Sequence, residues 1–421
     1  MIPEKSLKTK SPARTVLRIT PDFLKHSDRV RDYRLLNCRV RENAFAAAEG
    51  IANVRTLSGE PTALYFVENL ICYTTSTYFY LLPSGKSYSI VGEKVKDVAA
   101  YYDEAGTLYL FFLTNTRLHC ILNDSRLFVT GMGGGNCLAV HRERLFVAND
   151  YTLFYSQPLS PGTFSIALED TGKIPLDKRG GKVLALISHG GMLYLVRQRE
   201  ILRIRADAND LNFRIEKLDF DGGTIAEGSV QDCGKYIVLR TARGLATIDG
   251  TVCRLVRPAR EELVLGAAAG HGGRYFALAT HRGESCFYVY DPEGDTEYFM
   301  RGNASAIAGG WTSVFYLTGN IVGALTDESD YAEKRISITL DIGASDGSKR
   351  RIDGVTVFGN EGTYIARFKT EEGEAEMRLA AGKREALPSV LCGETLEFSL
   401  SCSDRGSVVT GINLHMREER V

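Results

Sequence analysis

A glycine-rich run, Gly-Met-Gly-Gly-Gly at residues 131–135, is the first pattern that could do chemistry, because glycine-rich loops bind phosphate groups. A dinucleotide loop needs a third spaced glycine, a mononucleotide loop needs a following Lys-Ser or Lys-Thr, and both lead into a helix. Residues 131–135 have neither feature, and they precede the strand-like run Cys-Leu-Ala-Val at residues 137–140. We therefore predict a loop between two repeats and no phosphate site.

A second run, Gly-Ala-Ser-Asp-Gly at residues 343–347, has the letters of the G-x-S-x-G motif that carries the nucleophilic serine of α/β-hydrolases. That serine needs a sharp turn from a strand into a helix. Here a polar turn leads on to Lys349-Arg350-Arg351 and to another strand-like run. We predict a hairpin turn without a nucleophile.

Metal binding and acid–base chemistry find little support in the spacing of their usual residues. The seven histidines contain no H-x-H or H-E-x-x-H pair, so we expect no metal site. Carboxylates could still converge for glycan hydrolysis. However, the sialidase turn S-x-D-x-G-x-T-W is absent, and residues 103–107 resemble it only faintly. We predict no catalytic residue, no cofactor and no metal, and we do not expect an enzyme.

The elements that position these residues repeat along the chain with a period of about forty residues. His189-Gly190-Gly191 and His271-Gly272-Gly273 lie 82 residues apart, and an apolar, aromatic-rich run follows each of them. A tight glycine turn before such a run is typical of a β-hairpin. Because both histidines recur at one repeat position, we predict that they cap turns and do not act in catalysis.

Four short strand-like runs per period indicate a β-propeller blade. We predict an all-β chain, with a propeller of six or seven blades over residues 58–332 and a small β-sandwich over residues 333–421. The pattern gives no local outer strand for the last blade, and residues 335–342 and 15–19 are the two candidates for it. The sequence lacks the recurring Trp of WD-type and Kelch blades, since Trp311 is its only Trp. A stacked solenoid and a pair of β-sandwiches remain as alternative folds for strands of this length.

The charge of the chain is balanced overall but not locally. Lys and Arg number 51 against 52 Asp and Glu, so no global field favours nucleic acid or an anionic membrane. Residues 1–57 begin with a basic stretch, which we interpret as an arm that leads into the first blade. This arm is either a solvated segment or a docking segment for a partner or for DNA. Its candidate contact residues are Arg29, Arg31, Arg34, Arg39 and Arg41.

The nine cysteines are scattered, contain no C-x-x-C pair and mostly lie in apolar runs. We therefore predict reduced cysteines in the protein core. The N-terminal residues contain no apolar signal-peptide region, and no stretch is long and apolar enough to span a membrane. We expect synthesis in a reducing cytoplasm.

A more specific pattern lies between residues 141 and 164. It reads H-x-x-R-L-F, then Tyr-Ser, then Pro-Gly-Thr-Phe. This segment resembles a stretch of β-propeller tail proteins of tailed bacteriophages, the tail nozzle or packaged-DNA stabilisation group, although Tyr and Ser are adjacent here. We expect the Leu-Phe pair in a core strand, the Tyr-Ser pair at the end of the next strand, and the last Phe packed on the blade. The motif residues are His141, Arg144, Leu145, Phe146, Tyr155, Ser156 and Phe164.

The C-terminal runs at residues 334–336, 352–357 and 411–414 likewise resemble the terminal β-sandwich of such virion proteins. The resemblance implies a structural virion protein of the tail or neck that forms a homo-oligomeric ring and contacts neighbouring tail or neck proteins near packaged DNA. It implies no catalytic residue. Two alternatives stay open: a cytoplasmic propeller scaffold that binds a protein or peptide, and a propeller that binds or hydrolyses glycans.

Overall fold

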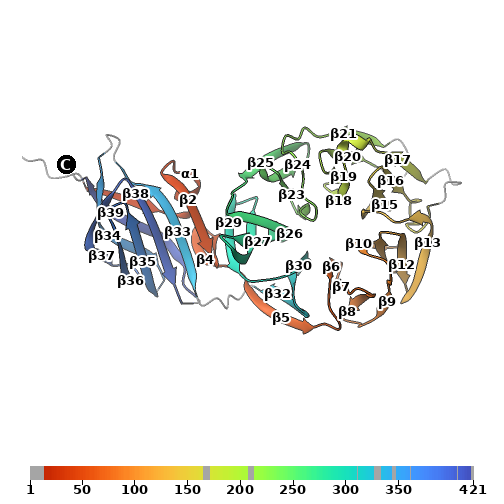
Figure 1. Ribbon diagram of the computed structural model, residues 1–421, viewed down its shortest axis with the longest axis horizontal. Coiled ribbons are helices and arrows are strands. Elements are labelled where there is room, and N and C mark those ends of the chain that lie inside the picture. The colour runs from red at the N-terminus through yellow and green to blue at the C-terminus, as the bar shows by residue number, and fades with distance from the viewer. Residues whose placement is uncertain are drawn as a thin grey trace, which may run out of the picture. The chain divides into compact units, whose positions relative to one another are not determined.

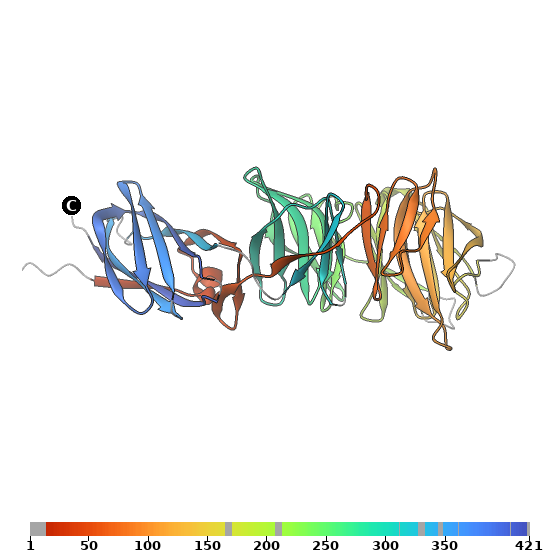
Figure 2. The ribbon, with the colours of Figure 1, turned by 90° about the horizontal axis from the view of Figure 1, so that it is seen from below.

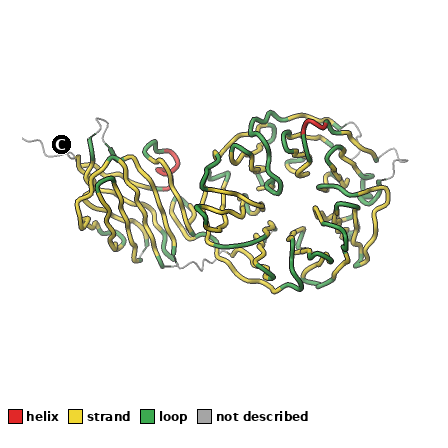
Figure 3. Tube along the Cα trace, in the orientation of Figure 1, coloured by secondary structure: helices red, strands yellow, loops and turns green. Residues whose placement is uncertain are grey.

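The computed structural model describes residues 14–164, 171–206, 213–310, 312–326, 333–343, 348–360, 362–404 and 406–418. Figure 3 shows that strands and their connecting loops make up nearly all of this chain, as predicted. The chain forms two compact units. One contains residues 51–294 and 302–325, and the other contains the described parts of residues 1–50, 295–301 and 326–421.

The larger unit is a β-propeller, and its described residues form seven blades (Figure 1). Within a blade, successive strands pair antiparallel, and the first strand lies innermost. Blade 1 contains β6 (Ala63–Val67), β7 (Leu70–Thr74), β8 (Tyr78–Leu82) and β9 (Ser87–Ser89). Blade 2 contains β10 (Val95–Tyr102), β11 (Leu108–Thr114), β12 (Arg117–Leu122) and β13 (Ser125–Gly133). Blade 3 contains β14 (Cys137–His141), β15 (Arg144–Asn149), β16 (Thr152–Tyr155) and β17 (Gly172–Pro175). Blade 4 contains β18 (Val183–His189), β19 (Met192–Arg197), β20 (Ile201–Arg205) and β21 (Arg214–Lys217), and the short helix η1 (Lys178–Gly180) precedes it. Blade 5 contains β22 (Gln231–Cys233), β23 (Tyr236–Thr241), β24 (Gly244–Asp249) and β25 (Val252–Pro258). Blade 6 contains β26 (Leu263–His271), β27 (Arg274–His281) and β28 (Glu284–Asp291), and blade 7 contains β30 (Ala306–Gly309), β31 (Val314–Thr318) and β32 (Ile321–Thr326).

The outer strand of blade 7 comes from the beginning of the chain. It is β5 (Gly50–Thr56), which lies next to β32 in the sheet. Just beyond it, the Leu57 amide donates a hydrogen bond to the Asn320 carbonyl at 2.8 Å. Both predicted closing strands, residues 335–342 and 15–19, are therefore wrong. Closure by a distant segment joins the first and last blades, so that the ring leaves no open blade.

Apolar side chains fill the space between successive blades (Figure 2 shows the blades edge-on). The residues between blades 2 and 3 include Phe111, Leu145 and Val147, all with no exposed surface. Similar clusters lie between blades 1 and 2, 3 and 4, 4 and 5, and 7 and 1. Each fully buried side chain of this size contributes about 1.5–3 kcal/mol. A single blade has two apolar faces and cannot cover both alone, which explains why the sequence repeats.

The smaller unit is a β-sandwich built from both ends of the described chain. One sheet has the order β3-β4-β39-β34-β37, with β1 on β39, and the other contains β29-β2-β33-β38-β35-β36. Its N-terminal elements are β1 (Arg14–Ile19), α1 (Pro21–His26), β2 (Val30–Leu36), β3 (Cys38–Arg41) and β4 (Ala44–Ala47). The others are β29 (Thr296–Arg301), β33 (Lys334–Asp341), β34 (Arg350–Gly359), β35 (Thr363–Thr370), β36 (Gly373–Ala380), β37 (Arg384–Gly393), β38 (Thr395–Cys402) and β39 (Val409–Glu418).

This arrangement differs from the predicted division into an arm (1–57), a propeller (58–332) and a sandwich (333–421). Residues 14–19 pair with β39, and β2 pairs with β33 from Val30 to Leu36. β33 alternates buried and half-buried residues, so one of its faces packs on the core, and it pairs with β2 on one side and β38 on the other. Arg14, Arg18 and Arg31 are exposed on these strands, which gives the stretch the composition of a solvated arm, whereas Arg34 and Arg39 are half-buried.

The described chain around the G-x-S-x-G letters is strand on both sides. β33 precedes Gly343, β34 begins at Arg350, and residues 344–347 lie outside the described residues. Because β34 and not a helix follows the run, the geometry of a hydrolase elbow is not met.

Candidate functional site

The phage-like segment at residues 141–164 lies in blade 3, and a buried arginine holds its strands together. Arg144, 2% exposed, begins β15. Its Nη1 donates a hydrogen bond to the Ser156 carbonyl at 2.7 Å, and its guanidinium carbon lies 5.7 Å from the centre of the Tyr155 ring. The Ser156 hydroxyl accepts the Leu145 amide at 2.9 Å and donates to the Gln157 carbonyl at 3.0 Å. These residues connect β15 to the end of β16.

The rest of the segment packs as the sequence predicts. Leu145 and Phe146 are fully buried in the core strand β15, and Ser156 directly follows β16. A turn between Ser160 and Thr163 returns the chain, and Phe164 packs, 5% exposed, among the residues between blades 2 and 3. The sequence predicts a structural role for these motif residues, and their contacts in blade 3 are of that kind.

The glycine-rich run also contacts Phe164. Gly131 has φ +81°, and a Cβ atom there would lie 2.8 Å from the Phe164 carbonyl oxygen. A Cβ on Gly134 would lie 2.2 Å from the carbonyl oxygen of Asn115. Residues 131–133 end β13, and residues 134–135 connect it to blade 3, so the predicted loop between repeats is confirmed for the last two residues of the run only. Close backbone approach explains the glycines here.

Three histidines each end the innermost strand of a blade and contact the next blade. His141 Nδ1 lies 2.8 Å from the Ser188 hydroxyl, and His189 Nδ1 lies 3.1 Å from a carboxylate oxygen of Asp232. His271 Nδ1 donates to the Gly310 carbonyl at 2.5 Å. His189 and His271 thus join neighbouring blades and do not cap their own turns, which corrects the prediction. The recurrence in the sequence indicated a structural role but not its partner.

Asp97 is a buried carboxylate that sequence reasoning missed. One oxygen accepts the Val98 amide at 2.8 Å, and the other accepts the Leu138 amide of blade 3 at 2.9 Å. Burial raises the pKa of Asp97 to about 6, and these two amide hydrogen bonds oppose the shift. The strand register is irregular between Val95 and Asp97, and this irregularity is a feature that a single sequence does not reveal.

Two of the five candidate arginines of the N-terminal stretch are engaged inside the sandwich unit. Arg39 pairs with the buried Glu49 carboxylate, which also accepts the Tyr298 hydroxyl at 2.7 Å. The guanidinium of Arg34 lies 5.2 Å from the centre of the Phe299 ring. Arg31 pairs with Asp341 at 2.5 Å, Arg41 lies 3.8 Å from Glu42, and both arginines are exposed. Arg29 is half-buried, and its backbone amide donates to the Ser27 hydroxyl at 3.3 Å.

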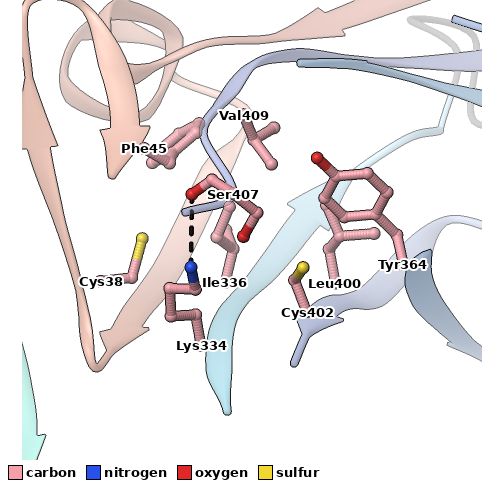
Figure 4. Close-up of a pocket in the computed structure, with 9 residues that line it drawn as sticks. All are labelled: Cys38, Phe45, Lys334, Ile336, Tyr364, Leu400, Cys402, Ser407 and Val409. Carbon is pink, nitrogen blue, oxygen red and sulfur yellow. Dashed lines mark hydrogen bonds between the residues drawn. The ribbon is translucent and has the colours of Figure 1, made fainter. Parts of the chain in front are cut away.

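A small cavity of about 20 Å³ lies inside the sandwich unit (Figure 4). Lys334 points into it and donates to the backbone carbonyls of Asp404 and, at 3.4 Å, Ser407. Burial lowers the pKa of Lys334 and raises the pKa of the neighbouring Cys38 thiol to about 12. A volume of this size holds about one water molecule. The cavity therefore joins N-terminal and C-terminal strands and offers no room for a substrate.

All nine cysteines are free thiols, and eight of them are buried, as predicted. Among the described residues, no three His, Cys, Asp or Glu side chains gather as a metal ion would require. No helix in the described parts of the chain is long and apolar enough to cross a membrane.

Comparison with known protein families and with curated proteins finds no match for this chain. Among solved structures, the chain is similar to the Pan2 WD40 domain of Neurospora crassa, with 9% identity and a TM-score of 0.45, over 63% of this chain and 89% of that one. It is also similar to PorZ of Porphyromonas gingivalis, with 10% identity and a TM-score of 0.43, over 77% of this chain and 46% of that one. The assignment of a propeller rests on the blades described above.

Proposed function

We propose that this chain is a structural protein of a tailed-phage particle, located in the tail or neck and without enzymatic activity. The observation that carries the proposal is the construction of blade 3. The segment that resembles phage nozzle proteins holds two strands together through Arg144 and Ser156, which have buried side chains. In this proposal the chain forms a homo-oligomeric ring, contacts neighbouring tail or neck proteins and lies near packaged DNA.

The outer strand of blade 2 supports a role in protein contacts. On β13, Phe128 is 53% exposed and lies on the same face of the blade as His119. The guanidinium carbons of Arg117 and Arg126 lie 5.1 Å and 5.3 Å from the centre of the Phe128 ring. Exposed aromatic side chains beside arginines are typical of the residues that dominate protein interfaces. We assign this patch, Phe128 with Arg117 and Arg126, as the contact with a neighbouring subunit and name it the β13 patch.

Substitution of Phe128 by Asp tests the β13 patch. We expect Phe128→Asp to leave the melting temperature within a few degrees of the wild type, because the side chain is exposed, and to lower the yield of infectious particles at least tenfold in a complementation assay. Val252→Asp is the matched control, since Val252 is a 42% exposed apolar residue on β25, the outer strand of blade 5. Normal particle yield with Phe128→Asp would contradict the assignment.

A further inference from the structure

A cavity of about 310 Å³ lies between blades 5 and 6 of the propeller. Blade 5 contributes the β23–β24 hairpin and the end of β25, and blade 6 contributes the start of β26 and one residue of β28. This volume falls in the range of small-molecule sites. The cavity has no role in the structural function proposed above.

The polar lining of the cavity is cationic. Arg240, Arg257 and Arg260 line it, and none of its thirteen lining residues, all described, is acidic. Arg240 Nε is buried and has no hydrogen-bond partner. This nitrogen has no solvent-accessible surface, so a ligand in the cavity meets the other atoms of the guanidinium groups. Three arginines with no carboxylate among the lining residues give the cavity a positive potential, which favours an anion.

The walls of the cavity are fixed and largely apolar. Gly244 has φ +134°, and a Cβ atom there would lie 1.9 Å from the Arg257 carbonyl oxygen, so the two strands are held in close approach. Leu245 and Tyr288 are 2% and 1% exposed, whereas Val264 is 62% exposed. A site with buried walls and one exposed apolar residue has a side open to solvent, through which a ligand can enter.

We propose that this cavity binds a small organic anion, with a carboxylate or phosphate group on the arginines and an apolar body against Leu245 and Val264. The guanidinium group offers a planar pair of donors that matches both anionic groups. Arg257 is held for this role, because its Nη1 donates to the Val256 carbonyl at 2.9 Å and its guanidinium carbon lies 5.0 Å from the centre of the Tyr290 ring.

Isothermal titration of the full chain with phenyl phosphate, benzoate and the neutral benzyl alcohol tests the proposal. We expect phenyl phosphate or benzoate to bind with a dissociation constant of about 1 mM or tighter, and benzyl alcohol at least tenfold more weakly. The stronger of the two anions identifies the anionic group that the site prefers. Absence of measurable binding by both anions, or equal binding of benzyl alcohol, would overturn the proposal.

Two substitutions locate the binding in this cavity. We expect Arg240→Gln to weaken binding of the preferred anion at least tenfold, and Arg254→Gln to leave it unchanged, because Arg254 is exposed on β25 and does not line the cavity. Arg240 is half-buried, so Arg260→Gln in the loop before β26 is a second test that spares the strands. Unchanged affinity in both the Arg240 and Arg260 variants would contradict the site.

Discussion

Arg144 carries a positive charge into the core of blade 3, where its guanidinium donates to the Ser156 carbonyl. A buried charge is stable only when its donors are satisfied, so Arg144 and the strands around it depend on each other. The sequence placed Arg144 in a motif, but only the structure shows that its partner is a backbone carbonyl.

Substitution of Arg144 by Met keeps the length of the side chain but removes the donor. We expect Arg144→Met to lower the free energy of unfolding by about 2 to 3 kcal/mol, because the Ser156 carbonyl loses its partner. Urea unfolding measures this change. Arg142→Met, at an exposed position two residues earlier, is the control and should change stability by no more than about 0.5 kcal/mol. Equal effects of the two substitutions would contradict this role.

A second prediction at the residue scale concerns Asp97 and the dependence of protein stability on pH. Its pKa is raised to about 6 in the folded protein, whereas an unfolded aspartate has a pKa of about 3.9. Between these values the folded state binds more protons, so the contribution of Asp97 to stability is fully present below about pH 4 and is lost as the pH rises through 6.

The matched variant is Asp97→Asn, which does not titrate. Relative to this variant, the wild type should lose about 2 to 3 kcal/mol of unfolding free energy between pH 4 and pH 7. Denaturant unfolding of both proteins at the two pH values measures the difference, and any constant effect of the substitution cancels. A stability difference that does not change with pH would show that Asp97 has an ordinary pKa.

At the scale of the elements, closure of the ring depends on β5. Leu57 directly follows this strand and packs, 6% exposed, among the residues between blades 7 and 1. We expect the fragment of residues 50–326 to melt cooperatively, and the fragment of residues 58–326, which lacks β5 and Leu57, to be less stable by at least about 3 kcal/mol. Circular dichroism melting compares the two fragments. Equal melting temperatures would mean that β5 does not close the ring.

The blades were predictable from the sequence because each one uses local hairpins, as in His189-Gly190-Gly191 before the run that became β19. The closing strand was not predictable from the sequence. β5 and β32 are far apart in the sequence, and no local pattern indicates that they pair. The basic stretch was misinterpreted for a related reason. Its residues Tyr33 and Leu35, on either side of Arg34, pair with Ile338 and Ile336 of β33, and this pairing is a long-range property.

The candidate site was predictable in part. Burial of Leu145, Phe146 and Phe164 follows from their apolar character and their place beside turns. The contacts of His141, His189 and His271 with the next blade depend on ring geometry, which the sequence does not contain. The same holds for the cavity of Arg240 and Arg257, since these residues come from different strands and meet only in the folded propeller.

At the scale of the whole molecule, the chain contains a closed seven-bladed propeller and a sandwich made from both ends of its described residues. In the proposed function, these units act through surfaces such as the β13 patch and not through a reaction. A structural role of this kind predicts a fixed stoichiometry, because closed symmetric assemblies contain a set number of subunits.

Quantitative mass spectrometry of gradient-purified particles, released from the source culture after prophage induction, tests the central claim most directly. The measurement compares the copy number of this chain with that of the major capsid protein. The proposal predicts that the chain co-purifies with the particles at a constant, low copy number, on the order of ten per particle, as expected of a closed ring. Absence of the chain from purified particles, together with its presence in the host cytoplasm, would contradict a role in the virion.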